Sequence, residues 1–242
     1  MKKLWIALAA LVCAAGAAHA HQIWLEPAEG QGTVLRFGEF GENLREVSPG
    51  LLDKFVQPTA TLVAGQDVKN SARAGKARDA YTLPFKAGQG ESIVAEEARY
   101  PLFNIKDGGK GWYHPAARLI TDFSAQEPRL VLDLVPTGKA GEFRLYYQGQ
   151  PKAKTKVTLV TQSGWAREAQ TDAEGRVQFS LPWKGPYVAE VSHTERTPGE
   201  RAGVNGPEKY DSISYTTTLS YVQPAGLEPI PAPPAAAPYQ SK

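Results

Sequence analysis

The stretch LVLDLVPTGKAGEFRLYYQGQPKAKTKVTLV, residues 130–160, decides the fold class of this chain. Apolar and polar residues alternate along 130–135, along 142–147 and again from residue 155 onward, and residues such as Pro136, Gly138 and Gly141 separate the runs. A period of two, interrupted by turn residues, is typical of short β-strands with one buried face. The spacing of the turns predicts strands of a small β-sandwich.

The same pattern extends in both directions from this stretch, whereas helical periodicity is hard to find. The segment TDAEGR at 171–176 has the aspartate and glycine of a hairpin turn, and 48–55 can form a single helical turn. We therefore predict an all-β chain with two β-sandwich-like domains. The further predicted strands are 33–37, 59–63, 81–85, 92–96, 117–123, 176–181, 187–192 and 212–222.

Composition divides the chain into four parts. Residues 1–20 form a leader, 21–127 an N-terminal β domain, 128–222 a C-terminal β-sandwich domain, and 223–242 a proline- and alanine-rich tail. The tail lacks the apolar residues of a packed core, so we expect it to be disordered or polyproline-like. The cluster WYHP at 112–115 is expected on a loop or at a strand start, because proline cannot donate to a strand ladder.

The leader has the features of a cleavable signal peptide. Lys2 and Lys3 precede an apolar stretch from 4 to 18, and Ala18-His19-Ala20 supplies small residues for cleavage after Ala20. A lipid anchor at Cys13 does not suit the Leu11-Val12 that precedes it. The apolar stretch is shorter than the ~20 residues of a membrane span, so we expect an exported periplasmic protein that does not span the membrane after cleavage.

Cleavage narrows the chemistry that the mature chain can perform. The single cysteine and the single methionine both lie in the leader, which excludes soft-ligand sites for Cu(I) or iron–sulfur clusters. Without Lys2 and Lys3, the 27 basic residues become 25, equal to the 25 acidic residues, so the net charge of the mature chain is about zero. Such a charge gives no indication of a nucleic-acid partner. We find no catalytic triad, paired carboxylates or phosphate-binding loop, and we expect no enzymatic activity.

A cut after Ala20 would make His21 the first residue of the mature protein. A free α-amine, with an ordinary pKa of roughly 8, and the imidazole of the same residue can chelate one metal ion, which displaces their protons. A cut after Ala18 would instead leave His19-Ala20-His21, which can wrap Cu(II) or Ni(II) without help from the fold. We favour the first cut, which requires the rest of the protein to complete the site.

Four segments carry a resemblance to a known family: HQIWLEP at 21–27, the stretch 130–160, TDAEGRVQFSLPWKGPYVAEVSHTE at 171–195 and YDSISYTTTLSYV at 210–222. They resemble a family of periplasmic two-domain β proteins that is formally a domain of unknown function and is associated with nickel, cobalt and other transition-metal uptake. The second half also resembles transthyretin-like and Ig-like sandwich modules. The family resemblance implies a metal-handling role at His21 and His193.

The hypothesis that follows is a divalent transition-metal site of His21, His193 and the third histidine of the mature chain, His114. Nitrogen ligands suit Cu(II) or Ni(II), with Co(II) also open, better than Ca(II) or Mg(II). A carboxylate of Glu26, Glu195 or Asp211 is a candidate fourth ligand or imidazole acceptor. Each histidine also has an ordinary alternative: solvent exposure for His21, a backbone hydrogen bond for His193, and aromatic packing for His114.

The predicted function is metal binding for an uptake or buffering system, with a membrane metal transporter or an outer-membrane receptor as partner. The main alternative is a structural, adhesion or carbohydrate-binding β module, in which exposed Trp112, Trp165 and Trp183 would stack in a row on a ligand. We expect Trp24 to be a core anchor that pins the N-terminus in place.

Overall fold

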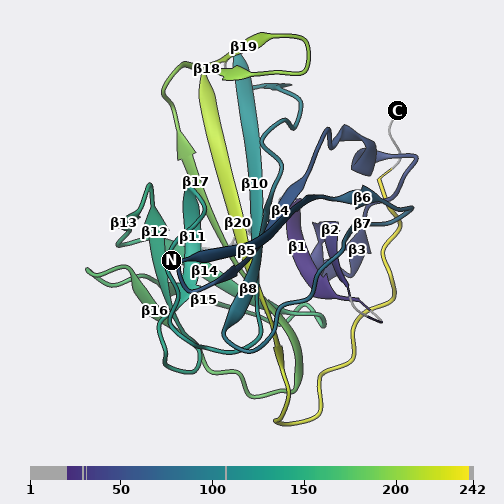
Figure 1. Ribbon diagram of the computed structural model, residues 1–242. Helices are drawn as coiled ribbons and strands as arrows, with labels where there is room; N and C mark the ends of the chain where they lie inside the picture. Colours follow the sequence, from purple (N-terminus) through teal and green to yellow (C-terminus); the bar gives the residue numbers. More distant parts are fainter. Residues whose placement is uncertain (1–20, 29, 31, 107, 240–242) are drawn as a thin grey trace, which may run out of the picture.

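The structure is a computed structural model that describes residues 21–28, 30, 32–106 and 108–239. The leader and its cleavage point lie outside the described residues. The described chain is built from strands in four sheets with two short 3-10 turns, which confirms the predicted all-β class (Figure 1). No helix among these residues has the length and apolar character needed to cross a membrane.

A nine-stranded sheet forms the spine of the molecule and contains the long strands β10, β17 and β20 (Figure 1). Its order is β15-β14-β17-β20-β10-β8-β4-β5, with β9 added beside β10. The strands are β15 (Ala166–Gln170), β14 (Lys156–Thr161), β17 (Gly185–Glu195), β20 (Ser212–Gln223), β10 (Lys110–Ile120), β8 (Glu91–Glu96), β4 (Thr59–Ala64), β5 (Asp67–Arg73) and β9 (Phe103–Asn104).

Two smaller sheets pack on this spine, and a separate hairpin projects beyond them. The first small sheet contains β1 (Gln22–Pro27), β2 (Thr33–Glu39), β3 (Leu44–Arg45), β6 (Gly75–Lys76) and β7 (Tyr81–Leu83). The second contains β11 (Leu132–Pro136), β12 (Glu142–Tyr147), β13 (Gln150–Pro151) and β16 (Arg176–Gln178), and the hairpin is β18 (Gly199–Ala202) with β19 (Pro207–Tyr210). The 3-10 turns are η1 (Phe40–Glu42) and η2 (Leu51–Lys54).

The hydrophobic interior divides into two main cores. One takes buried residues between Ile23 and Leu119 and lies between the first small sheet and the spine. The other takes buried residues between Ile120 and Tyr221 and lies between the second small sheet and the spine. The architecture is therefore that of two β-sandwiches, as predicted. They share one sheet, because β10 and β20 pair along their length in parallel.

Strand β10 is longer than the predicted strand 117–123 and includes the WYHP cluster that we expected on a loop or at a strand start. Pro115 is accommodated because β8 pairs with β10 only from Ala116 onward, so no ladder hydrogen bond from residue 115 is required on that side. Its carbonyl oxygen accepts the N–H of Glu97 at 3.1 Å. The predicted helical turn is confirmed as η2, and the hairpin turn closes through the Gly175 N–H and the Asp172 carbonyl at 3.1 Å.

The N-terminal strand β1 is buried on both faces. Ile23 and Trp24 are fully buried although their side chains point in opposite directions, Ile23 into the first core and Trp24 against Phe40 and two valines of β14 and β17. The outer edge of β1 is covered by side chains of the spine: Tyr113 donates its hydroxyl hydrogen to the His21 carbonyl at 2.6 Å, and Thr218 donates to the Ile23 carbonyl at 2.7 Å.

The proline- and alanine-rich segment runs back along the first small sheet as an extended strap (residues 223–239), drawn in yellow in Figure 1. Composition predicted a disordered or polyproline-like tail, and the chain is extended along this course. Because the strap adds little to either core, it is held mainly through its few backbone N–H and C=O groups. Leu227 N–H donates to the Pro182 carbonyl at 2.9 Å, Ala236 N–H donates to Asn43 at 3.2 Å, and Glu228 pairs with Lys184 at 2.7 Å.

Candidate functional site

His21 lies immediately before β1, between two aromatic rings. Its ring centroid is 5.1 Å from that of Phe37 on β2 and 5.0 Å from that of Tyr239 at the end of the strap. The hydrogen bond from Tyr113 holds the His21 backbone against the spine. The residue is therefore fixed by groups from β2, β10 and the strap, which excludes the simple solvent-exposed alternative.

Two glutamates flank the His21 imidazole. Its Nε2 lies 2.6 Å from Oε1 of Glu46, and its Nδ1 lies 3.3 Å from Oε1 of Glu39. Glu39 ends β2, and η1 and β3 turn the chain back so that Glu46 follows on the same side, with its N–H donating to the Phe37 carbonyl at 2.8 Å. The sequence segment GEFGENLREV, residues 38–47, thus supplies both carboxylates.

The Glu46 carboxylate is fully buried and has several partners. Besides His21, it accepts the backbone N–H of Tyr239, whose nitrogen lies 3.2 Å from Oε2. Burial and the nearby Glu46 charge raise the pKa of Tyr100 to about 12. A buried carboxylate hydrogen-bonded to one imidazole nitrogen fixes the orientation of the ring and leaves the other nitrogen for a ligand. Sequence reasoning missed Glu39 and Glu46, because nothing in their spacing indicates a turn that returns both to His21.

The other two candidate histidines lie on the spine, on the face opposite His21. His114 of β10 and His193 of β17 both pair with Tyr215 of the intervening β20, so the three side chains share one face. Tyr113, which binds the His21 backbone, precedes His114 and therefore projects from the other face. The sheet itself separates His21 from His114 and His193.

His114 is buried and stacks on Trp112, with ring centroids 5.1 Å apart and planes 10° from parallel. Its Nε2 lies 2.9 Å from Oε2 of Glu96, a hydrogen bond that lowers the pKa of the glutamate. Its Nδ1 is buried and has no hydrogen-bond partner among the described residues. This is the aromatic-packing role that we weighed as the alternative for His114.

His193 packs edge-on against Tyr147 of β12, with ring centroids 4.5 Å apart. Burial lowers the pKa of His193, and the positive charge of Lys152 lowers it further. A neutral imidazole is ready to bind a metal. Its place beside Tyr147 and Tyr215 is nevertheless that of a packed aromatic ring.

The described residues contain no group of three or more histidine, cysteine, aspartate or glutamate side chains arranged to hold a metal ion. The predicted carboxylates have other partners: Glu26 binds Arg36 and Arg45 at 3.1 Å each, and Asp211 accepts the N–H of Lys110 at 2.7 Å. Glu195 hydrogen-bonds to the side chain of Tyr147. Among the described residues, the side chains of this kind beside His21 are those of Glu39 and Glu46.

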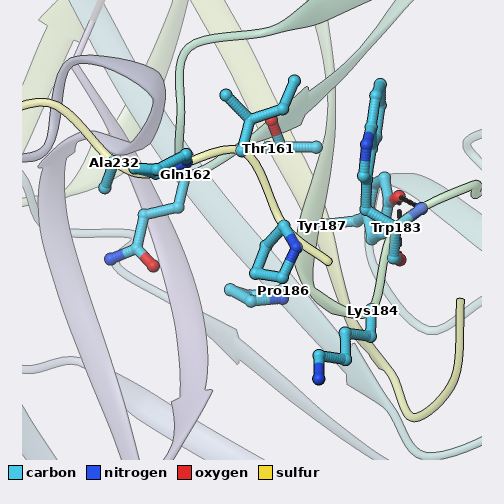
Figure 2. A pocket seen from close by; sticks show the side chains of 10 residues that line it. Thr161, Gln162, Trp183, Lys184, Pro186, Tyr187 and Ala232 are labelled. Atoms are coloured by element: carbon cyan, nitrogen blue, oxygen red, sulfur yellow. Dashed lines mark hydrogen bonds between the residues drawn. The ribbon is translucent and has the colours of Figure 1, made fainter. Parts of the chain in front are cut away.

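The tryptophans of the alternative hypothesis do not form a row. Trp165 and Trp183 contact each other edge to face, with ring centroids 4.8 Å apart. Trp183 comes just before β17, whose first residue pairs with Gln223, so this contact lies near the Gln223 end of β20. Trp112 pairs with Ile213 at the opposite end of β20. Trp183 and Tyr187 line a small pocket of about 160 Å³, and residues 229–232 of the strap form another part of its lining (Figure 2).

Comparison with known proteins identifies a domain family of unknown function for part of the chain. Residues 129–195, in the second half of the chain, match the family described as "Domain of unknown function (DUF4198)". No curated protein matches. One solved structure, "Structural insight into host cell surface retention of a 1.5-MDa bacterial ice-binding adhesin", aligns at 10% identity over 86% of this chain and 65% of its own, with a TM-score of 0.24. That score is too low to carry an argument about fold or function.

Proposed function

We propose that the mature protein binds one divalent transition-metal ion at His21, for uptake or buffering of the metal in the periplasm. The supporting observation is the placement of the His21 imidazole between Glu39 and the fully buried Glu46. In this proposal the α-amine and Nδ1 of His21 chelate the ion, Glu39 supplies an oxygen ligand, and Glu46 accepts the hydrogen of Nε2.

The distances fit these roles. Nitrogen and oxygen ligands each lie about 2.0–2.2 Å from a divalent ion of the first transition row, so two neighbouring ligands lie roughly 3 Å apart. Nδ1 of His21 and Oε1 of Glu39 are 3.3 Å apart. Two nitrogens and one carboxylate favour Cu(II) by the general affinity order, with Ni(II) and Co(II) next. The resemblance of the sequence to metal-uptake proteins favours nickel, and a membrane transporter or outer-membrane receptor as partner.

The test compares two forms of the protein, each with its N-terminus confirmed by intact mass. One begins at His21, and the other carries an additional alanine before it. We expect one-to-one copper and nickel binding by the first form. Binding by the second form should be weaker by at least about 100-fold, since even partners outside the ligand shell are worth 10–100-fold. The first form should also bind more weakly as the pH falls below the α-amine pKa of roughly 8.

Either of two other results would overturn the proposal. Equal binding by both forms would remove the α-amine from the site. Absence of binding by both would reject the metal function and favour the alternative, a structural or ligand-binding β module.

Replacement of Glu46 by glutamine should weaken metal binding by about 10–100-fold, because the neutral amide holds the His21 ring less firmly and makes it less basic. Titration of nickel into the protein that begins at His21 would measure this. The matched control is Glu97→Gln. Glu97 is also fully buried, but it binds the backbone N–H groups of Val56 and Gln57 at 2.9 and 2.7 Å. Equal losses of affinity in the two variants would show that Glu46 acts only through stability.

A further inference from the structure

A cleft of about 530 Å³ lies beside His21, which is one of its lining residues. It is bounded on one side by the first small sheet and η2, and on the other by β10, β17 and β20. This volume falls within the range of roughly 300–1,000 Å³ that small-molecule sites have. The cleft is thus large enough for an organic ligand beside the proposed metal ion.

The lining of the cleft contains an aromatic group and a hydroxyl-bearing group of side chains. Four aromatic rings, those of Phe37, Tyr100, Phe103 and Tyr113, form the aromatic group, and Tyr113 brings it onto the side of β10. Tyr100 meets Tyr113 edge to face at 5.3 Å and Phe37 at 6.1 Å, so these rings support one another, while Phe103 is 43% exposed at the rim. Such a group of rings accepts the flat or hydrocarbon part of a ligand.

A ladder of four hydroxyl groups on β17 and β20 forms another part of the lining. Ser192 and Thr194 of β17 pair in register with Thr216 and Ser214 of β20, and the paired oxygens lie 3.0 and 3.1 Å apart. Each pair uses one hydroxyl hydrogen, and Thr216 also hydrogen-bonds to Tyr113. One donor therefore remains for a ligand in the Thr194–Ser214 pair, and both pairs keep acceptor positions. Ser192 and Thr194 are exposed to the cleft.

Lys54 at the end of η2 is the lysine of the cleft lining. It is exposed and makes no ion pair with the described residues. Near His21 the charges are reversed, since Glu39 and Glu46 carry negative charge. An anionic ligand would pair with Lys54, but it would be repelled near His21 until a metal cation is bound there.

We infer that this cleft holds a small carboxylate-bearing organic chelator, of the hydroxy-acid or amino-acid class, coordinated to the metal ion at His21. This inference rests on the proposed function. One carboxylate pairs with Lys54, the carbon skeleton lies on the aromatic group, and the remaining polar groups bind the hydroxyl ladder. The protein supplies three ligands: the α-amine nitrogen and Nδ1 of His21, and one oxygen of Glu39. The chelator fills the remaining coordination positions of the ion. Metal and chelator therefore bind cooperatively, each strengthening the binding of the other.

The probe is nickel citrate with the protein that begins at His21. Equilibrium dialysis with labelled citrate measures its retention by nickel-loaded and metal-free protein. We expect the nickel-loaded protein to bind citrate at least about tenfold more tightly than the metal-free protein. Lys54→Met should weaken citrate binding by about tenfold, the loss of one charge-assisted hydrogen bond, and leave nickel affinity unchanged. The control is Lys69→Met, at an exposed lysine of β5 away from the cleft, which should change neither.

The outcomes separate this inference from the proposed function. Nickel titration without citrate tests the function alone, and failure there rejects both. If nickel binds but citrate is not retained, or removes the nickel, only the chelator inference fails. Equal retention of citrate by metal-free protein, or no effect of Lys54→Met, would also overturn it.

Discussion

Replacement of Arg118 by leucine is expected to destabilise the protein by about 3–5 kcal/mol. Arg118 of β10 and Asp133 of β11 are both fully buried, and their side chains form a two-pronged ion pair with distances of 3.0 and 2.5 Å. The guanidinium also donates to Ser92 of β8 and to Gln126, each at 2.8 Å. The leucine would leave the buried Asp133 charge without its partner, and urea unfolding would measure the loss.

Two further variants show whether the cost arises from the unpaired charge. The double variant Arg118→Leu with Asp133→Leu removes both charges and should recover most of the loss. It would still lack the hydrogen bonds that Asp133 accepts from the backbone N–H groups of Arg129 and Leu130, about 1 kcal/mol each. Arg167→Leu, at an exposed arginine of the edge strand β15, should stay within about 0.5 kcal/mol of the parent. A loss below about 1 kcal/mol for Arg118→Leu would contradict the expectation.

This ion pair illustrates which parts of the fold the sequence could not predict. Alternation predicted strands around both residues, since 117–123 and 130–135 read as β-strands in the sequence. Which strand lies beside which depends on long-range packing, and the two partners belong to different sheets. An arginine within an alternating run is ordinarily assigned to the solvent face, so only the three-dimensional arrangement identifies it as buried.

The same limit applies to the candidate site. Within one strand, alternation places Tyr113 and His114 on opposite faces. It cannot say which of them faces His21, because that depends on the packing of β1 against the spine. The motif HQIWLEP singled out His21, and the structure supplies the two glutamates that surround it. The grouping of His21 with His193 rested on the family resemblance, and His114 was added as the third histidine of the expected mature chain. The spine lies between His21 and the other two.

For the tail, composition predicts how little it contributes to the core but not which backbone hydrogen bonds it forms. Proline and alanine do predict that residues 223–239 add little to a core, and most of the strap is exposed. Composition says nothing of individual backbone N–H groups, which find acceptors on Pro182, Asn43 and Glu46. The strap thereby reaches His21 through Tyr239.

Trp24→Ala should destabilise the protein by about 3–5 kcal/mol, the usual cost of a large cavity in a core. The sequence predicted a core anchor here, and the structure confirms it. The Trp24 side chain is fully buried, meets Phe40 edge to face at 5.7 Å, and packs with Val160 and Val188 of the second half. Its indole N–H donates to Glu26 at 2.8 Å. Trp24 thus joins the N-terminal strand to the spine.

Thermal and urea unfolding of the protein that begins at His21 would measure the loss, with Trp165→Ala as the control. Trp165 is only partly buried and should cost less. A loss for Trp24→Ala no larger than that of the control would contradict the role of an anchor.

Because His21 lies immediately before β1, loosening Trp24 should also weaken nickel binding in protein that is still folded. Glu97→Gln should lower stability without that effect, since Glu97 binds backbone groups of residues 56 and 57 rather than β1. Of Trp24→Ala and Glu97→Gln, only Trp24→Ala should therefore lower both stability and metal affinity, because only it loosens the N-terminal strand.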